Sequence, residues 1–464
     1  MNDRRRPSHL VLTLIAGERC PHVPAHVDVL VGGDRPAGHL DGGPLDRTLS
    51  GCGGAFRVAT VFHARRNLGR VGARGVGYDD LEEELGLSRT YRVQLAEPDG
   101  VAEAVDRLRE RSVVESASVE CLATAPAGVA TAALPTRTEM EAPHRMVRAA
   151  EALAREPGDE RVTVAVVDTG VSLGHAEFQR KLLSGWDAVE LGIGRISADT
   201  TLVGDSHGRD FSPTDDVGHG SHVAGIIGAQ GWQLPPGIAG RSLLLPVRVL
   251  AGAQTLGTDS VTGVGAMGDI DAGLKVAVDL GARIVNMSFG TPSSALDPGA
   301  PRPHQMVLEY AARNGCVLVA ASGNSGGRED FWPAADPRVI AVGSVGPDGR
   351  RSSFSTYGPH LAVSAPGEEI TSVGRYGYRR STGTSHAAPF VAGAAALLVA
   401  HARRAGVELG AGEVRELLTS SAGPSASPPD EVGSGVLDID AALDALDRRL
   451  AHAPTTTLRG GDHG

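Results

Sequence analysis

The sequence predicts an α/β fold in which a mostly parallel central sheet is flanked by helices, preceded by a small α+β N-terminal domain. Short runs of β-branched residues recur from about residue 144 onward, and helical segments separate them. These runs are apolar throughout, which is typical of strands that helices cover on both faces. The first 123 residues instead combine strand-like and helical segments in a shorter unit.

Each strand and helix of the larger part is predicted from its own segment. The strands are expected at residues 162–167 (VTVAVV), 283–289 (RIVNMSF), 316–321 (CVLVAA) and 339–345 (VIAVGSV). The helices are expected at residues 145–156, 273–281 and 305–315. Together these segments predict one α/β domain over residues 144–450, followed by a disordered tail over residues 451–464.

The N-terminal unit, residues 1–123, is predicted to contain a β–α–β half. Residues 90–95 (TYRVQL) have strand composition, residues 100–111 have helical periodicity, and residues 112–123 return as a strand. A first strand is expected at Leu10–Ala16. Residues 124–143 are rich in Ala, Pro and Thr and have little periodicity, so they are predicted to be a linker.

Composition argues against several classes of partner. A net charge of −11 and a pI near 5.8 give no clustered basic face, so nucleic acid is not an expected partner. The apolar stretch at residues 387–400 is shorter than the ~18 residues a membrane span needs, so no membrane partner is expected either. Four isolated cysteines, and a short N-terminal apolar run without a small-residue cleavage site, favour the cytoplasm. Secretion is the alternative.

Four polar residues lie where chemistry gathers in such a fold, at the ends of strands or helices. Asp168 follows the first strand, Asn324 follows a later one, His219 precedes an apolar helix, and Ser385 heads the run GTSHAAPFVAG. Each has a structural alternative: a helix cap or turn for Asp168, a turn for Asn324, a packed small residue for Ser385. His219 could pair with His222 as a metal ligand, but no third ligand follows.

The four residue types together match one reaction. A serine nucleophile needs an imidazole to take its proton, a carboxylate to orient that imidazole, and donors for the oxyanion. Pro389 removes the N–H that would bond the carbonyl of Ser385, which loosens the first helical turn around the serine. The neighbouring Asp215 and Asp216 are expected to be a solvated pair in the loop before His219.

The chain resembles the subtilisin-like serine peptidases. The motifs VVDTGV, GHGSHVAGI, NMSFG, AASGN and GTSHAAPFVAGAAALL occur in the family's order, and the resemblance covers about residues 144–445. It implies that Asp168 orients His219, that His219 is the general base and then acid, and that Ser385 attacks the scissile carbonyl. It also implies that the Asn324 amide and the backbone N–H of Ser385 form the oxyanion hole.

The resemblance also implies where a peptide substrate binds. The extended backbone of the substrate would pair with a first segment and would have a second segment on its other side. A third segment would line the primary specificity pocket. The residues concerned are Ser288, Phe289 and Gly290; then Gly263, Val264 and Gly265; and then Ala320, Ala321, Ser322 and Gly323. Because the third group is small and uncharged, the pocket is expected to accept bulky apolar or neutral side chains.

Three departures from the family pattern qualify these expectations. His386 follows the serine where many relatives have Met. Residues 228–240 lack the Asn/Asp-bearing loop of the strong calcium site in many relatives, so no metal or cofactor is expected to be required, although a weak calcium site elsewhere stays open. The N-terminal unit resembles a subtilase propeptide only in its second half, so it is interpreted as an intramolecular inhibitor or chaperone, with a permanent recognition domain as the alternative.

The function expected is that of a serine endopeptidase acting on polypeptide substrates, in intracellular protein turnover or in the maturation of a specific peptide. A scaffold that binds extended peptides without cutting them is the rival class. The presence of all four residues argues against it, because an inactive relative usually has one of them replaced. Acyl transfer by the same residues is a third alternative.

Overall fold

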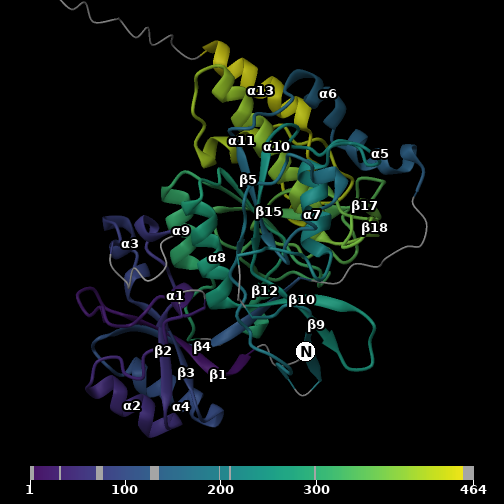
Figure 1. Cartoon of the computed structure of the whole chain (residues 1–464). Coiled ribbons are helices and arrows are strands. Elements are labelled where there is room, and N and C mark those ends of the chain that lie inside the picture. Colours follow the sequence, from purple (N-terminus) through teal and green to yellow (C-terminus); the bar gives the residue numbers. More distant parts are fainter. Residues whose placement is uncertain are drawn as a thin grey trace, which may run out of the picture.

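The computed structural model describes residues 5–30, 33–68, 77–125, 135–197, 199–207, 211–296 and 299–452. Figure 1 shows the N-terminal domain in purple and blue, lying against the larger α/β domain in teal, green and yellow. Both predicted parts of the fold are therefore present.

The N-terminal domain is an antiparallel sheet in the order β2-β3-β1-β4, with an apolar core that includes Leu10, Leu12 and Leu108. The predicted strand, helix and strand of its second half are confirmed as β3, α4 and β4. Its elements are β1 (Arg5–Leu14), α1 (His26–Leu30), α2 (Pro44–Gly53), β2 (Phe56–Thr60), α3 (Asp80–Glu84), β3 (Thr90–Leu95), α4 (Val101–Arg109) and β4 (Val114–Ala125).

The first strand begins earlier than predicted. It was expected at Leu10–Ala16, but β1 spans Arg5–Leu14. Backbone pairing with β4 begins at Arg5, and beyond Leu14 the chain turns at Gly17, whose φ is 94°. Pairing partners, which a local apolar pattern does not reveal, therefore decide where this strand starts and stops.

The larger domain is built on a seven-stranded parallel sheet in the order β16-β15-β13-β11-β5-β8-β6. The predicted α/β class is confirmed, and each of the four predicted strands lies in this sheet. Its strands are β5 (Thr163–Asp168), β6 (Trp186–Asp187), β8 (Leu243–Arg248), β11 (Ile284–Met287), β13 (Val317–Ala321), β15 (Val339–Val345) and β16 (Leu361–Pro366).

Helices cover both faces of this sheet, as its apolar strands predict. One apolar core joins one face to α6, α7, α10, α11 and α13, and a second joins the other face to α8 and α9. The helices are α5 (Arg137–Met146), α6 (Ala149–Arg155), α7 (His219–Gly228), α8 (Met267–Asp279), α9 (Gln305–Arg313), α10 (Thr384–Arg404), α11 (Ala411–Ser420), α12 (Pro429–Val432) and α13 (Ile439–His452).

The helix α10 is the long apolar helix of this domain. By length and hydropathy it passes a test for a membrane span, yet 94% of its apolar window is buried inside the protein. Its small residues permit this packing: a Cβ at Gly393 would lie 2.5 Å from the Cβ of Ile238. Within the described residues, then, the one helix that passes the test is a core helix.

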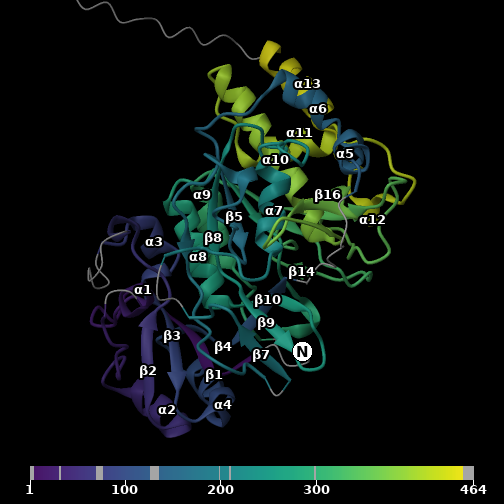
Figure 2. The ribbon, with the colours of Figure 1, turned by 45° about the vertical axis from the view of Figure 1, so that its right-hand side comes forward.

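A second sheet joins the two domains. The strand β4 pairs with β10 (Val261–Ala266) of the larger domain, and the sheet continues through β9 (Ala251–Thr255) to β7 (Thr200–Val203). Figure 2 shows β4 beside β10 and β9 at this junction. Two short antiparallel pairs complete the strands, β12 (Thr291–Pro292) with β14 (Phe331–Trp332) and β17 (Ile370–Val373) with β18 (Tyr378–Ser381).

The predicted linker, residues 124–143, contains ordered structure at both ends. β4 continues to Ala125, and α5 begins at Arg137 with Thr136 and Glu139 forming a reciprocal capping box. The helix has little apolar periodicity, so its sequence does not indicate it, and the cap is the local signal that marks its start. Residues 126–134 lie outside the described residues, as does the predicted tail beyond His452, where α13 ends.

Candidate active site

Asp168 and His219 form a buried hydrogen-bonded pair. Asp168 ends β5 at the carboxyl edge of the parallel sheet, and His219 is the first residue of α7. The Nδ1 atom of His219 lies 2.7 Å from the Asp168 Oδ1, and both side chains are almost fully buried. A carboxylate only accepts hydrogen bonds, so Nδ1 carries the proton and Nε2 is left as the basic nitrogen.

Asp215 supports the loop before His219, a role that the sequence did not indicate. The expectation of a solvated Asp215 is wrong: its side chain is 3% exposed and its Oδ1 accepts from the backbone N–H groups of Val217 and Gly218. It also accepts from Thr169 and Ser221 side chains. Burial raises the pKa of Asp215, and these donors oppose the rise. The carboxylate thus anchors the residues that position the imidazole.

Ser385 lies in the first turn of α10 and is buried. Its Oγ donates to the carbonyl of Ser288 at 2.9 Å, and its own carbonyl accepts from the Ser288 Oγ at 2.8 Å. The second bond uses the carbonyl that Pro389 leaves without a helical partner. The Nε2 of His219 has no hydrogen-bond partner among the described residues, so the hydroxyl–imidazole bond is not formed in this arrangement.

Asn324 is held beside the serine through its amide oxygen. That oxygen accepts from the backbone N–H and the hydroxyl of Thr384, each at 2.9 Å. Since the oxygen is engaged, the amide nitrogen is the group left to donate. It lies close to the start of α10, where a Cβ at Gly383 would come within 3.3 Å of it. Asn324 itself is an exposed residue.

The predicted substrate segments lie on either side of the chain's own β4. Residues Gly263, Val264 and Gly265 on β10 pair antiparallel with residues 123–125. On the other side, the backbone N–H of Thr124 donates to the Gly290 carbonyl at 3.3 Å, and Gly290 returns a bond of 3.2 Å. The end of β4 therefore fills the position that an extended peptide would occupy between these segments.

The remaining predicted substrate residues are buried next to the serine. Ser288 and Phe289 precede Gly290, and Ala320, Ala321 and Ser322 end β13 or follow it without solvent exposure. Gly323 has a φ of 102°, and a Cβ there would meet the ring of Phe331 at 2.9 Å. The same ring lies against Gly290. Phe331, which the sequence did not single out, thus bounds the space between two of the predicted segments.

Three histidine rings cluster behind the serine. The ring centroid of His386 lies 5.6 Å from that of His219 and 4.3 Å from that of His222. Burial lowers the pKa of His222 to about 3 and that of His386 well below its usual value. Both are therefore neutral near pH 7. Among the described residues, no group of three or more potential ligands is arranged to hold a metal ion, and His222 instead contacts two backbone carbonyls.

A carboxylate–imidazole pair beside a serine at a helix N-terminus, with an amide donor nearby, is the arrangement that serine hydrolases use. The comparison with known families agrees. The model of the subtilase family matches residues 159–437, and the chain belongs to that family. These residues form a serine endopeptidase domain.

Its relatives are proteinases of the same kind. The chain is 36% identical to the thermophilic serine proteinase of Bacillus sp. (strain AK1), over 53% of this chain and 54% of the relative. It is 35% identical to thermitase of Thermoactinomyces vulgaris, over 52% of this chain and 76% of thermitase. Among solved structures, the prenylagaramide maturation protease PagA is 27% identical with a TM-score of 0.50, covering 64% of this chain and 98% of PagA. The match thus spans about half of the first relative.

Proposed function

We propose that this protein is a serine endopeptidase that cuts extended polypeptide segments, with Asp168, His219 and Ser385 as its catalytic triad. The observation that supports this most is the buried 2.7 Å contact between His219 Nδ1 and Asp168 Oδ1, because it leaves Nε2 as a base. A scaffold that only binds peptides has no use for an oriented and unpartnered imidazole nitrogen.

The reaction begins with a change of hydrogen bond at the serine. The Ser385 hydroxyl leaves the Ser288 carbonyl, turns to Nε2 of His219 and gives it a proton while Oγ attacks the scissile carbonyl carbon. The Asn324 amide and the Ser385 backbone N–H hold the resulting oxyanion. Nε2 then protonates the leaving amine, and a water molecule, activated by the same nitrogen, hydrolyses the acyl-enzyme and frees Ser385.

The substrate takes the place that the end of β4, residues 123–125, now holds. Its backbone pairs with residues 263–265 on one side and with residues 288–290 on the other, and the side chain before the scissile bond enters the space lined by residues 320–323. Main-chain pairing of this type needs an extended or unfolded segment. Since none of these residues is charged, the pocket favours apolar or neutral side chains. A cleavage profile on a peptide library that requires Lys or Arg would contradict this.

The N-terminal domain acts as an intramolecular inhibitor while β4 is in place. Residues of the segment 123–125 pair with both walls of the groove, and this pairing keeps an extended peptide out of the groove. We favour maturation of a specific peptide over general turnover, on the likeness to a maturation protease that this chain covers almost completely. One preferred sequence in the library supports maturation, and broad cleavage supports turnover.

Two further parts of the proposal concern the need for a cofactor and the cellular compartment. The reaction needs no cofactor, so activity after treatment with a chelator should equal that of the untreated protein. The site of action is the cytoplasm, where the thiols of four cysteines stay reduced: Cys20, Cys52, Cys121 and Cys316.

The decisive experiment is covalent labelling with a serine-reactive fluorophosphonate. The wild-type chain should be labelled on Ser385, Ser385→Ala should not be labelled, and Asp168→Asn should be labelled far more slowly because the imidazole loses its orienting carboxylate. Ser385→Ala, once shown to fold normally, is the negative control for labelling at any other residue. Absence of label on a folded wild-type chain, with β4 displaced, would favour the scaffold.

A further inference from the structure

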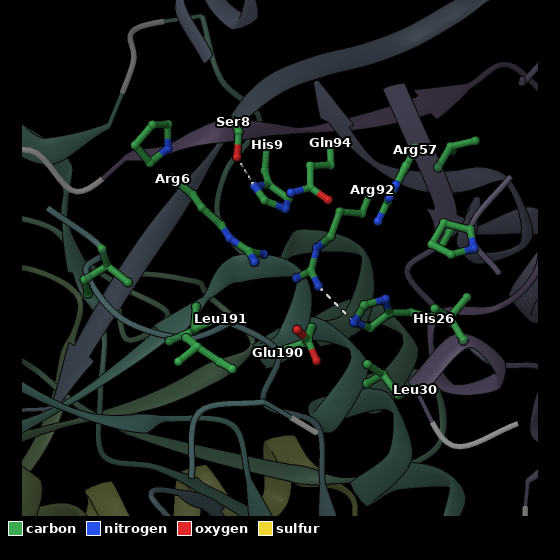
Figure 3. Close-up of a pocket in the computed structure, with 18 of the residues that line it drawn as sticks. Arg6, Ser8, His9, His26, Leu30, Arg57, Arg92, Gln94, Glu190 and Leu191 are labelled. Atoms are coloured by element: carbon green, nitrogen blue, oxygen red, sulfur yellow. Dashed lines mark hydrogen bonds between the residues drawn. The ribbon is translucent and has the colours of Figure 1, made fainter. Parts of the chain in front are cut away.

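A cavity of about 490 Å³ lies at the junction of the two domains, outside the triad. Residues of β1, β2 and β3 form one side of it, and residues 190–196 of the larger domain form the other. Figure 3 shows Arg6, Arg57 and Arg92 pointing toward the same space, with Glu190 and Leu191 opposite. Cavities of this size at domain interfaces are typical of ligand sites.

The floor of this junction pocket is a neutral, fixed network of charges. Arg92 donates to Glu120 at 2.7 and 2.9 Å and lies 2.7 Å from Asp269 of the larger domain, while Arg6 lies 3.1 Å from Glu120. Although burial opposes it, the charges of Arg92 and Arg6 lower the pKa of Glu120 to about 2. Two arginines and two carboxylates thus offset one another and hold the two domains together below the pocket.

The pocket also carries two cationic side chains that form no ion pair among the described residues. Arg57 on β2 and Arg195 in the larger domain both line it, both are exposed, and neither has a side-chain partner among the described residues. His9 and His26 line it as well, and burial lowers the pKa of His9 to about 3, so it adds no charge. One free guanidinium from each domain therefore faces a space large enough for a peptide segment, in a chain whose net charge is −11.

The same pocket offers acceptors for N–H groups. The Oε2 of Glu190 is buried and has no hydrogen-bond partner among the described residues, while its Oε1 lies 3.4 Å from the Nδ1 of His207. Gln94 is exposed and lines the opposite wall. A small inorganic anion would be repelled by the Glu190 carboxylate and would offer that carboxylate few hydrogen-bond donors. A peptide backbone brings N–H donors, and an acidic side chain on that peptide would reach the arginines.

The pocket adjoins the substrate groove along β4. Leu122 lines the pocket and pairs with Ala266, only two residues before Thr124, which pairs with Gly290. Because β4 is antiparallel to residues 288–290, it runs toward Ser288 and hence toward Ser385 as its numbering rises. A substrate in the same orientation would therefore lead from the pocket to the serine, with its N-terminal part at the pocket.

We propose that the junction pocket binds an acidic segment of the polypeptide substrate, N-terminal to the bond that is cut. The carboxylate pairs with Arg57 and Arg195, the backbone with Glu190 and Gln94, and neighbouring apolar side chains with Leu30, Leu122 and Leu191. This rests on the proposed peptidase function, and it makes the docked N-terminal domain part of substrate recognition as well as a block on the groove.

Binding is measured on the full chain carrying Ser385→Ala, so that no cleavage interferes. The probes are three fluorescein-labelled ten-residue peptides of Ala and Leu, which carry two Glu, two Gln or two Lys at the same positions. Fluorescence anisotropy should give a dissociation constant for the Glu peptide about tenfold below that for the Gln peptide, as charge-assisted bonds predict. The preference should weaken as the salt concentration rises.

Variants then locate the site. Arg57→Ala with Arg195→Ala should weaken the Glu peptide about tenfold, and Arg57→Glu should shift the preference toward the Lys peptide. Arg47→Ala is the matched control, because Arg47 is exposed on α2 of the N-terminal domain and does not line the pocket. This variant should bind the Glu peptide with the same affinity as the parent Ser385→Ala chain. Three results would overturn the proposal. The first is equal affinity for the Glu and Gln peptides, and the second is a double variant that binds the Glu peptide as tightly as the parent chain does. The third is displacement of the labelled Glu peptide by inorganic phosphate at the same concentration as by unlabelled Glu peptide.

The two proposals fail separately. If wild-type protein with β4 displaced takes no fluorophosphonate label while the Ser385→Ala chain still prefers the Glu peptide through Arg57 and Arg195, only the peptidase proposal fails. If labelling succeeds and the peptides bind alike, only the pocket assignment fails. In a cleavage assay on wild-type protein, an acidic segment placed N-terminal to the scissile bond should lower KM about tenfold relative to the Gln version.

Discussion

At the scale of single residues, the serine is prepared by its neighbours before any substrate arrives. Pro389 frees the Ser385 carbonyl for Ser288, and Thr384 fixes the amide oxygen of Asn324. The importance of Pro389 could be predicted from the sequence, because a proline acts on a carbonyl four residues earlier in its own helix. The partners of Asn324 and of the buried Asp215 could not, since they depend on contacts across the fold.

Asn324→Ala should lower kcat by about 10²–10³ with little change in KM. The amide is proposed to donate only to the oxyanion, and the magnitude is the one known for the corresponding donor of subtilisin, a member of the same family. Steady-state kinetics on the preferred library peptide would measure it. Asn324→Asp is the isosteric control and should be at least as impaired. A loss confined to KM would contradict the assignment.

His386 should make the activity tolerant of mild peroxide. An imidazole is not oxidised under conditions that convert a thioether to a sulfoxide, and His386 lies against the ring of His219. Residual activity after peroxide treatment should stay near that of untreated protein, whereas His386→Met should lose activity severalfold under the same treatment. Both proteins are compared with their own untreated samples. A sharp loss in the wild-type chain at low peroxide would refute the prediction.

At the scale of elements, one strand belongs to two structures. β4 is the edge strand of the N-terminal sheet and also pairs with β10 at the groove, so one continuous sheet crosses from one domain to the other. The sequence indicated a strand in this segment. It did not indicate the pairing with β10, because the partners of a strand do not follow from its own apolar pattern.

Thr124→Pro should speed fluorophosphonate labelling of Ser385. Proline has no N–H, so the bond from Thr124 to the Gly290 carbonyl is lost and the end of β4 is held less firmly in the groove. The rate should rise severalfold over that of wild type, measured by in-gel fluorescence against time. Thr124→Ala keeps the N–H and is the matched control. Equal rates for the proline and alanine variants would argue against β4 as a block.

At the scale of the whole molecule, buried charges tie the two domains together. Lys275 of α8 is buried and lies 2.5 Å from Glu82 of the N-terminal domain and 2.7 Å from Asp279. At the other end of α8, Glu120 accepts from the Gly268 N–H at 3.2 Å while Arg92 pairs with Asp269. Separating the domains would leave several of these groups without partners, which favours a docked N-terminal domain.

Lys275→Ala should lower the free energy of unfolding by about 3–5 kcal/mol, because buried Glu82 then loses its cation and Asp279 keeps only Arg65, at 4.0 Å. Thermal and denaturant unfolding of the full chain, followed by circular dichroism, would measure the loss. Arg47→Ala, an exposed change in the N-terminal domain, is the control and should lie within ~0.5 kcal/mol of wild type. A Lys275→Ala chain as stable as wild type would show that the network contributes nothing to stability.

The sequence alone determined the α/β class, the order of Asp168, His219, Asn324 and Ser385, and the small uncharged character of the predicted pocket. These follow from patterns and motifs along the chain, where residue type and local spacing carry the information. Only the tertiary structure decided that β4 lies in the groove, that Asp215 is buried, and that Arg57 and Arg195 face one cavity. Each of these depends on which distant segments meet, and buried contacts between two domains are set by the fold as a whole.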